Sequence, residues 1–173
     1  TSPCAICQAG SVVEVGVGTG VVTSGATTCT ACAAGLYSAQ STTACQACPD
    51  GSYTNTLSAS GAVTCTACAA GRASPNSITA CALCAAGQYQ GSSGQANCIT
   101  CAAGHYTDTL NSTNGTTCTA CAPGRYTAVS SSACAICAAG SVTDTLGSVG
   151  AINCSVCGAG QYSVDPTIQC AAH

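Results

Sequence analysis

The stretch CTACAAGLY (29–37) contains the pattern that decides the fold. Two cysteines separated by two residues are followed by a glycine three residues later, and a tyrosine comes two residues after the glycine. The same pattern returns along the whole chain. The complete C-x-x-C pairs are Cys4 and Cys7, Cys29 and Cys32, Cys45 and Cys48, Cys65 and Cys68, Cys81 and Cys84, Cys98 and Cys101, Cys118 and Cys121, Cys134 and Cys137, and Cys154 and Cys157. Cys170 is a half-pair, with His173 in the place of its partner.

The spacing of the pairs divides the chain into units. Residues 1–28 form a first repeat with a long loop insert, and residues 29–173 are tandem C-x-x-C repeats that alternate between about 16 and 20 residues. A fixed period indicates an array in which each unit contacts chiefly its neighbours. The valine- and glycine-rich insert at 12–28 is predicted to form a small hairpin.

Glycine and tyrosine recur at fixed places in the units. A glycine at this place, such as Gly35 or Gly104, predicts a turn that needs a positive φ or a close approach of two chains. The tyrosine ring, as at Tyr37, is expected to cover the neighbouring disulfide. Because the segments between these points show no helical periodicity, we expect short β-strands and turns with little or no helix.

The composition excludes an ordinary hydrophobic core. The chain of 173 residues has no Phe, Trp or Met, and its hydrophobic fraction of 47% consists mostly of Ala and Cys. Its 19 cysteines instead indicate a disulfide scaffold, which belongs to oxidising compartments. Each closed loop of about 15 residues contributes roughly 3 kcal/mol through the unfolded state. We therefore expect an extracellular or cell-surface protein that is stabilised by disulfides.

Charge and hydropathy limit the possible partners. Charged residues make up 4% of the chain, Arg72 and Arg125 are its permanent cations, and the formal net charge is −3. No basic surface is available for nucleic acid. No apolar stretch approaches the roughly 20 residues of a transmembrane helix.

Hydroxyl-rich loops take the place of charge in keeping the surface hydrated. Ser and Thr fill about a quarter of the chain and offer sites for glycans. Asn111, Asn114 and Asn153 satisfy the N-glycosylation pattern. Asn153 is the weakest candidate, because the middle residue of its sequon is Cys154. We predict a glycoprotein.

The pattern C-x-x-C-x-x-G-x-Y followed by a loop and the next pair resembles the cysteine-rich repeats of ephrin-receptor-like and tumour-necrosis-factor-receptor-like ectodomains. The segments CTACAAGLY (29–37) and GAVTCTACAAG (61–71), which carry no charged residue, also resemble ciliate surface (immobilisation) antigens. The resemblance covers nearly the whole chain. It implies an elongated array of small disulfide-closed modules on a cell surface or in an extracellular filament.

The resemblance also implies a disulfide pairing, in which the second cysteine of each pair bonds the first cysteine of the next. The implied bridges are Cys7–Cys29, Cys32–Cys45, Cys48–Cys65, Cys68–Cys81, Cys84–Cys98, Cys101–Cys118, Cys121–Cys134, Cys137–Cys154 and Cys157–Cys170. Cys4 is then unpaired or intermolecular. An alternating linkage, first to third and second to fourth, stays open because sequence alone does not fix connectivity.

Zinc binding is the main alternative for the cysteines, because pairs separated by 15–20 residues match zinc-ribbon spacing. Zinc modules need cysteines in fours, with free spacing between modules, whereas here the intervals are similar and the complete pairs number nine. A redox C-x-x-C would need one privileged pair. We expect no metal and no cofactor.

The chain contains few side chains that could act as catalytic acids, bases or nucleophiles. His105 and His173 are the candidate bases near neutral pH, and His105 occupies a variable position where an exposed bystander is expected. Asp108 and Asp144 hold matching positions in two of the long units, and Asn55 holds the same position in the remaining one. A residue at this position is predicted to cap its own turn. One carboxylate falls short of the six to eight oxygen ligands of calcium. We predict that the protein is not an enzyme.

These observations favour a structural role. We expect an extracellular glycoprotein that is a protomer or segment of a surface coat or filament and that associates with itself, because low charge promotes association. The alternative is a ligand-binding or adhesive cell-surface ectodomain, either receptor-like or a lipid-anchored surface antigen.

Overall fold

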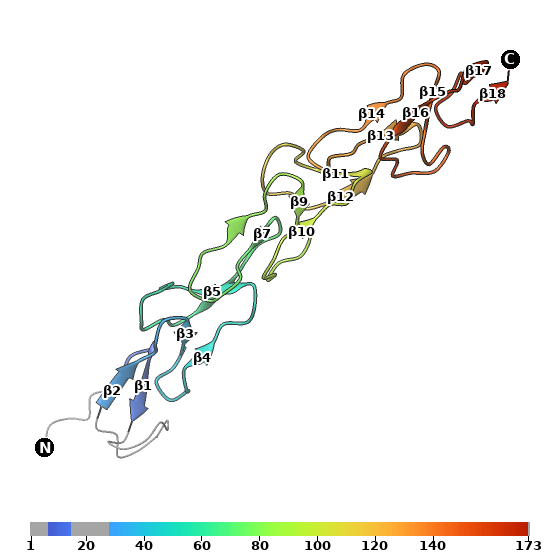
Figure 1. Cartoon of the computed structure of the whole chain (residues 1–173). Coiled ribbons are helices and arrows are strands. Elements are labelled where there is room, and N and C mark those ends of the chain that lie inside the picture. The colour runs from blue at the N-terminus through green and yellow to red at the C-terminus, as the bar shows by residue number, and fades with distance from the viewer. Residues whose placement is uncertain (1–6, 15–27, 173) are drawn as a thin grey trace, which may run out of the picture. The chain divides into compact units, whose positions relative to one another are not determined.

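The computed structural model describes residues 7–14 and 28–172. Cys4, His173 and most of the 12–28 insert lie outside the described residues. The described chain contains no helix, and its strands pair in sequence order into two-stranded sheets. The sheets are β1 (Ser11–Glu14) with β2 (Thr28–Ala31), β3 (Leu36–Tyr37) with β4 (Gln46–Ala47), β5 (Ser52–Thr54) with β6 (Cys65–Ala67), β7 (Arg72–Ala73) with β8 (Ala82–Leu83), β9 (Gln88–Tyr89) with β10 (Ile99–Thr100), β11 (His105–Thr107) with β12 (Cys118–Ala120), β13 (Arg125–Tyr126) with β14 (Ala135–Ile136), β15 (Ser141–Thr143) with β16 (Cys154–Val156), and β17 (Gln161–Tyr162) with β18 (Ala171–Ala172) (Figure 1).

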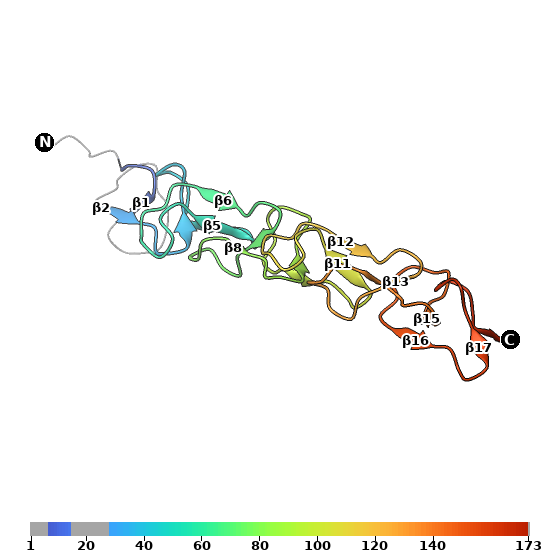
Figure 2. The same cartoon turned by 90° about the horizontal axis from the view of Figure 1, so that it is seen from above.

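Each sheet begins just after the glycine of a repeat and returns at the next C-x-x-C pair. In one example, β5 pairs antiparallel with β6, with Ser52 opposite Ala67 and Thr54 opposite Cys65. The strands β11 and β12 pair in the same way, and Figure 2 shows them side by side. At the base of the 12–28 insert, β1 pairs with β2, so the strands that flank this loop form a hairpin.

Among the described residues, nine disulfides join cysteines that are neighbours along the chain. The bridges are Cys7–Cys29, Cys32–Cys45, Cys48–Cys65, Cys68–Cys81, Cys84–Cys98, Cys101–Cys118, Cys121–Cys134, Cys137–Cys154 and Cys157–Cys170. These are the pairs that the resemblance implies. We call the segment closed by each bridge a module, numbered one to nine in chain order. The structure is a small disulfide-rich repeat array of short paired strands, as the sequence predicts.

The chain divides into two compact units. The first contains Thr1–Ala69, Ala73–Ala82 and Ser93–Asn97, and the second contains Ala70–Arg72, Leu83–Ser92 and Cys98–His173. In both units the buried centre consists of cysteines, hydroxyl groups and small residues. Cys32, Thr54 and Ala62 are buried in the first unit, and Cys121, Thr143 and Ala151 are buried in the second.

Candidate functional site

The glycine that follows each C-x-x-C pair forms a tight turn. From Gly10 to Gly160 these nine glycines have φ between 73° and 83°, which L-residues other than Asn and Asp rarely adopt. At Gly104 the amide donates to the Thr127 carbonyl at 2.8 Å, and the Cys121 amide donates to the Gly104 carbonyl at 2.8 Å. A Cβ at Gly104 would collide with the backbone of Gly150. The recurring glycine therefore serves both the turn and the close approach of another module.

Pairs of reciprocal backbone hydrogen bonds link consecutive modules, and we call each such pair a clamp. The clamp between modules seven and eight is one example. The Gly150 amide of module eight donates to the Cys121 carbonyl of module seven at 2.8 Å, and the Thr127 amide of module seven donates to the Ala151 carbonyl of module eight at 3.1 Å. The equivalent bonds are Gly61 to Cys32 with Ser38 to Ala62, Gly94 to Cys68 with Ser74 to Gln95, and Asn114 to Cys84 with Gln90 to Gly115. Each clamp holds a dipeptide that begins four residues before a disulfide cysteine.

From the turn at Gly35 to the turn at Gly140, the third residue after the glycine donates its amide to the next module. Besides the clamp residues, the Thr54 amide donates to Ser77 at 2.8 Å, Thr107 to Ser130 at 3.1 Å, and Thr143 to Pro166 at 2.9 Å. These bonds occur within both units. Backbone hydrogen bonding, rather than apolar packing, therefore joins one module to the next.

The side chain at this third position is buried and mostly a hydroxyl. Thr54, Thr107 and Thr143 are 0%, 0% and 1% exposed. Their hydroxyls donate to the carbonyls of Leu57, Leu110 and Leu146. In short modules, Ser38 and Ser74 donate to two carbonyls of their own loop. The abundance of Ser and Thr predicts hydration and glycans and does not predict this role, although every repeat from Ser38 to Ser163 has Ser, Thr or Gln at this position.

Asn55, Asp108 and Asp144 support the long loops, and the prediction that each caps its own turn is wrong. Their carboxylate or amide oxygens instead accept hydrogen bonds from backbone amides eight or nine residues downstream. Asp108 Oδ1 accepts from the Thr116 amide at 2.9 Å, and Oδ2 accepts from the Thr116 hydroxyl at 2.6 Å. The Thr116 hydroxyl, followed by the backbone amides, lowers the pKa of Asp108. These side chains close the base of a loop.

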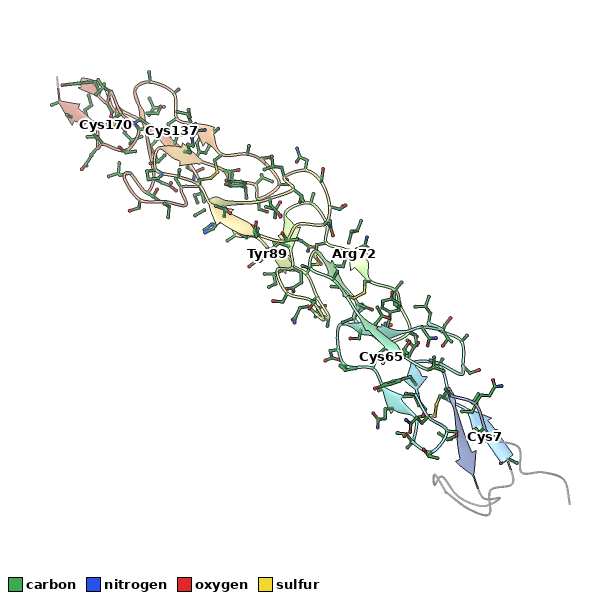
Figure 3. The ribbon with its side chains drawn as sticks, turned by 180° about the vertical axis from the view of Figure 1, so that it is seen from behind. Cys7, Cys65, Arg72, Tyr89, Cys137 and Cys170 are labelled. Carbon is green, nitrogen blue, oxygen red and sulfur yellow. A yellow bond between two sulfur atoms is a disulfide. The ribbon has the colours of Figure 1, made fainter. Side chains whose placement is uncertain are left out.

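His105 is half-buried rather than exposed. Its Nδ1 lies 3.2 Å from the Ala103 carbonyl, and its Cε1 lies 3.6 Å from a Cβ built at Gly150. Among residues 7–14 and 28–172, no three His, Cys, Asp or Glu side chains gather into a metal-binding group. The cysteines that a zinc site would need are joined in disulfides (yellow bonds in Figure 3).

One shallow, mainly apolar hollow lies in the second unit. It is lined by Tyr106, Leu110, Thr119, Ala120, Ala122, Arg125, Ala133 and Cys134. Arg125 Nη1 donates to the Cys134 carbonyl at 3.2 Å, and both residues line the hollow. An aromatic ring beside a cation and methyl groups is able to contact a small part of a protein or sugar ligand.

The three predicted glycosylation asparagines lie at the surface in different settings. Asn111, Asn114 and Asn153 are exposed. Asn114 has φ 74°, its amide takes part in a clamp, and its side chain lies against the turn at Gly71. The carbonyl of Asn153 accepts a hydrogen bond from the Asp144 amide at 3.2 Å. Asn111 is the member of the set with the fewest such constraints.

Part of the chain matches the model of a known family. Residues 35–77 and 71–118, just under half of the chain, match the model of the family described as tyrosine-protein kinase ephrin type A/B receptor-like. No curated protein matches the chain. With the nine disulfides, the match indicates a cysteine-rich domain of the extracellular, receptor-like type, consistent with a secreted or surface location. Among the described residues, no helix is long and apolar enough to span a membrane.

Proposed function

We propose that this chain is an extracellular structural glycoprotein, a protomer or segment of a surface coat or filament. The observation that carries the proposal is the repeated clamp. Because the modules are joined through backbone groups, a further module can be added to the array without requiring particular side chains at the contact. This property suits an array that extends by repetition.

The covalent and charge properties support the same role. Serial disulfides restrict the unfolded chain and so stabilise an array that buries few large apolar side chains. The net charge of −3 offers little repulsion between copies. Glycans on exposed loops, with Asn111 as the best-placed acceptor, would hydrate the surface in place of charged side chains.

Sedimentation and electron microscopy of the secreted, oxidised protein test this proposal. A structural protomer is expected to form polymers whose size rises with protein concentration, and reduction of the disulfides is expected to abolish them. Protein that stays monomeric at every concentration, with all nine bridges intact, would contradict the structural role.

A ligand-binding ectodomain is the second candidate, and the match to the ephrin-receptor-like model favours it. The hollow between Tyr106 and Arg125 would then contact the ligand. Screening of the wild-type chain against glycan and cell-surface protein arrays tests this role, with the double variant Tyr106→Ala/Arg125→Ala as the control. Binding that the double variant loses would support the ectodomain over the coat or filament.

A further inference from the structure

Module nine contains an acid-sensitive peptide bond inside a hydrogen-bonded turn. Asp165 is the one aspartate of the chain that precedes a proline, Pro166. A bond to proline is a tertiary amide, and the carboxylate of a preceding aspartate can attack its own main-chain carbonyl by closing a succinic anhydride ring. Asp-Pro bonds are for this reason more sensitive to acid than other peptide bonds. The hydrogen bonds of the turn act on both partners of this attack.

The carbonyl that would be attacked accepts a short hydrogen bond. The Ser163 hydroxyl donates to the Asp165 carbonyl at 2.6 Å, and its contact with the Ile168 carbonyl is longer, at 3.0 Å. The Asp165 amide donates to the Ser163 hydroxyl oxygen at 3.3 Å, which orients the hydroxyl. A donor at a carbonyl oxygen stabilises the negative charge that develops when the carbon is attacked. Ser163 is therefore placed to assist attack at the Asp165 carbonyl.

The carboxylate of Asp165 is fixed through one of its two oxygens. Oδ1 accepts from the Thr167 amide at 2.8 Å and from the Thr167 hydroxyl at 2.7 Å. Among the described residues, none donates to Oδ2, so this oxygen keeps its lone pairs for attack. The Thr167 hydroxyl, followed by the Thr167 amide, lowers the pKa of Asp165. The carboxylate therefore stays ionised, and able to attack, at a lower pH than an ordinary aspartate.

The neighbouring modules do not pair with this carboxylate. Thr143 of module eight donates to the Pro166 carbonyl, and the Pro166 ring lies against the glycine turn that precedes β13 in module seven. The charged side chains of these two modules are Arg125 and Asp144, and each hydrogen-bonds a backbone group of its own module. The other titratable side chains of modules seven to nine are tyrosines, which stay neutral in acid. Acid therefore acts here on Asp165 and its bond to proline.

Module four has the same turn without the reactive groups. The Ser74 hydroxyl donates to the Asn76 carbonyl at 2.8 Å, and Asn76 Oδ1 accepts from the Ile78 amide at 3.2 Å. Ser77 stands in the place of Pro166. The turn thus forms with neither an aspartate nor a proline, and Asp165-Pro166 adds a chemical property to it.

We propose that Asp165-Pro166 is a self-cleavage site at which the chain cuts itself in acidic surroundings. An oxygen of the Asp165 carboxylate attacks the Asp165 carbonyl carbon, and the bond from this carbon to the Pro166 nitrogen breaks as that nitrogen takes a proton from the solvent. The product is a cyclic anhydride. Both residues are half-buried, so water reaches them, and one water molecule opens the anhydride to leave two carboxyl groups on Asp165 beside a new N-terminal proline.

The cut changes the link between two modules without separating the chain. The Cys157–Cys170 disulfide spans the cut, so both products stay joined. The Pro166 carbonyl accepts from the Thr143 amide and hydroxyl, and after cleavage it belongs to a free N-terminal residue instead of a closed loop. Acid would thus loosen module nine from module eight at one defined place. This property goes beyond the proposed structural role and does not depend on it.

Matched variants separate the contributions of the nucleophile, the leaving group and the hydroxyl. Asp165→Asn and Pro166→Ser give the turn the residues of module four, and both variants are expected to stay intact. Ser163→Ala is expected to slow cleavage at least about tenfold, because the carbonyl loses its donor. Ser163→Thr is the control, because Thr127 holds this place in module seven and its hydroxyl donates to the Val129 carbonyl at 2.9 Å.

Mass spectrometry before and after reduction measures the cut. The oxidised protein is held near the ordinary pKa of Asp, at about pH 4, and at neutral pH. The expected product in acid is heavier by one water before reduction and releases a peptide that begins at Pro166 after reduction. The reduced and alkylated chain, which has the same sequence without the folded turn, is expected to be cleaved more slowly than the oxidised protein.

Three results would overturn the proposal. Oxidised protein that is cleaved no faster than the reduced, alkylated chain would mean that the folded turn does not assist the reaction. Equal rates for Ser163→Ala and Ser163→Thr would remove the hydroxyl from the mechanism. A cut that persists in Asp165→Asn would place the cleaved bond elsewhere.

Discussion

The amide and the hydroxyl of Thr143 both donate to the carbonyl of Pro166, at 2.9 Å and 3.2 Å. The hydroxyl also donates to the Leu146 carbonyl at 3.0 Å. One buried threonine thus holds its own loop and the following module together. Buried hydroxyls occupy this position in a chain that has few large apolar side chains and buries few of them.

Removal of this hydroxyl is expected to weaken the module. Thr143→Val keeps the shape and the backbone bond to Pro166 but leaves the Leu146 carbonyl without its hydroxyl donor, and we expect a loss of about 1–2 kcal/mol in the free energy of unfolding. Thr143→Ser is the matched control, because it keeps the hydroxyl. Denaturant unfolding with the disulfides intact measures the difference, and equal stability of the two variants would contradict the hydrogen-bonding role.

The turn glycines differ in what surrounds them. Gly104 and Gly160 have φ of 77° and 75°, but only Gly104 lies against the backbone of Gly150. Gly104→Ala is therefore expected to cost about 1–3 kcal/mol more than Gly160→Ala, which bears only the conformational penalty. Denaturation midpoints of dilute monomers test this difference. Equal midpoints would mean that the close approach at Gly104 does not contribute.

Acid is expected to loosen the loop that Asp108 closes. The Thr116 hydroxyl, followed by the backbone amides of Thr116 and Thr117, lowers the pKa of Asp108. A lowered pKa in the folded state means that the ionised carboxylate stabilises the loop above the ordinary pKa, and that this contribution is lost as the pH falls through the lowered pKa. The amide chemical shifts of Thr116 and Thr117 would report this transition.

Two substitutions separate charge from hydrogen bonding at Asp108. Asp108→Asn places there the residue that Asn55 supplies in module three, so the loop is expected to keep its shape and lose its pH dependence. Asp108→Ala is expected to cost about 1 kcal/mol at neutral pH. A pH transition of the Thr116 amide that persists in Asp108→Asn would assign it to another group.

Glycan occupancy is expected to follow the local backbone. Asn111 is expected to be occupied most and Asn153 least, because Asn153 precedes a disulfide cysteine and Asn114 lies against the turn at Gly71. Glycopeptide mass spectrometry after enzymatic release in heavy water gives the occupancy of each site. Full occupancy of Asn153 with an empty Asn111 would reverse this order.

The oxidised chain is expected to resist stretching. Tension between Cys7 and Cys170 passes through the disulfides, with Cα–Cα distances near 5.6 Å, and through the short C-x-x-C links. The fully extended length is then about 130 Å, against about 550 Å for the reduced chain. Single-molecule force spectroscopy with and without reductant measures both lengths. An oxidised length close to the reduced one would contradict serial pairing.

The sequence predicted the features that depend on fixed spacing. The recurrence of Gly35 and its equivalents predicted positive-φ turns, and the segments without helical periodicity form short strands. The sequence did not predict the clamps, because they use backbone groups of Cys121 and Thr127 that leave no side-chain signature. The position of Asp108 was recognised, but its partners lie eight and nine residues away, a distance that loop closure sets rather than local turn chemistry.

The order of the disulfides has a consequence for biosynthesis. Each cysteine from Cys7 onward bonds either the next one along the chain or the one before it, after sequence separations of 13 to 22. A nascent chain that enters an oxidising lumen at about 5–20 residues per second would therefore hold one waiting thiol of this series at a time. Cysteines that emerge later would find their predecessors already bonded. The array can thus mature from its first module onward as it is synthesised, with little need for disulfide isomerisation.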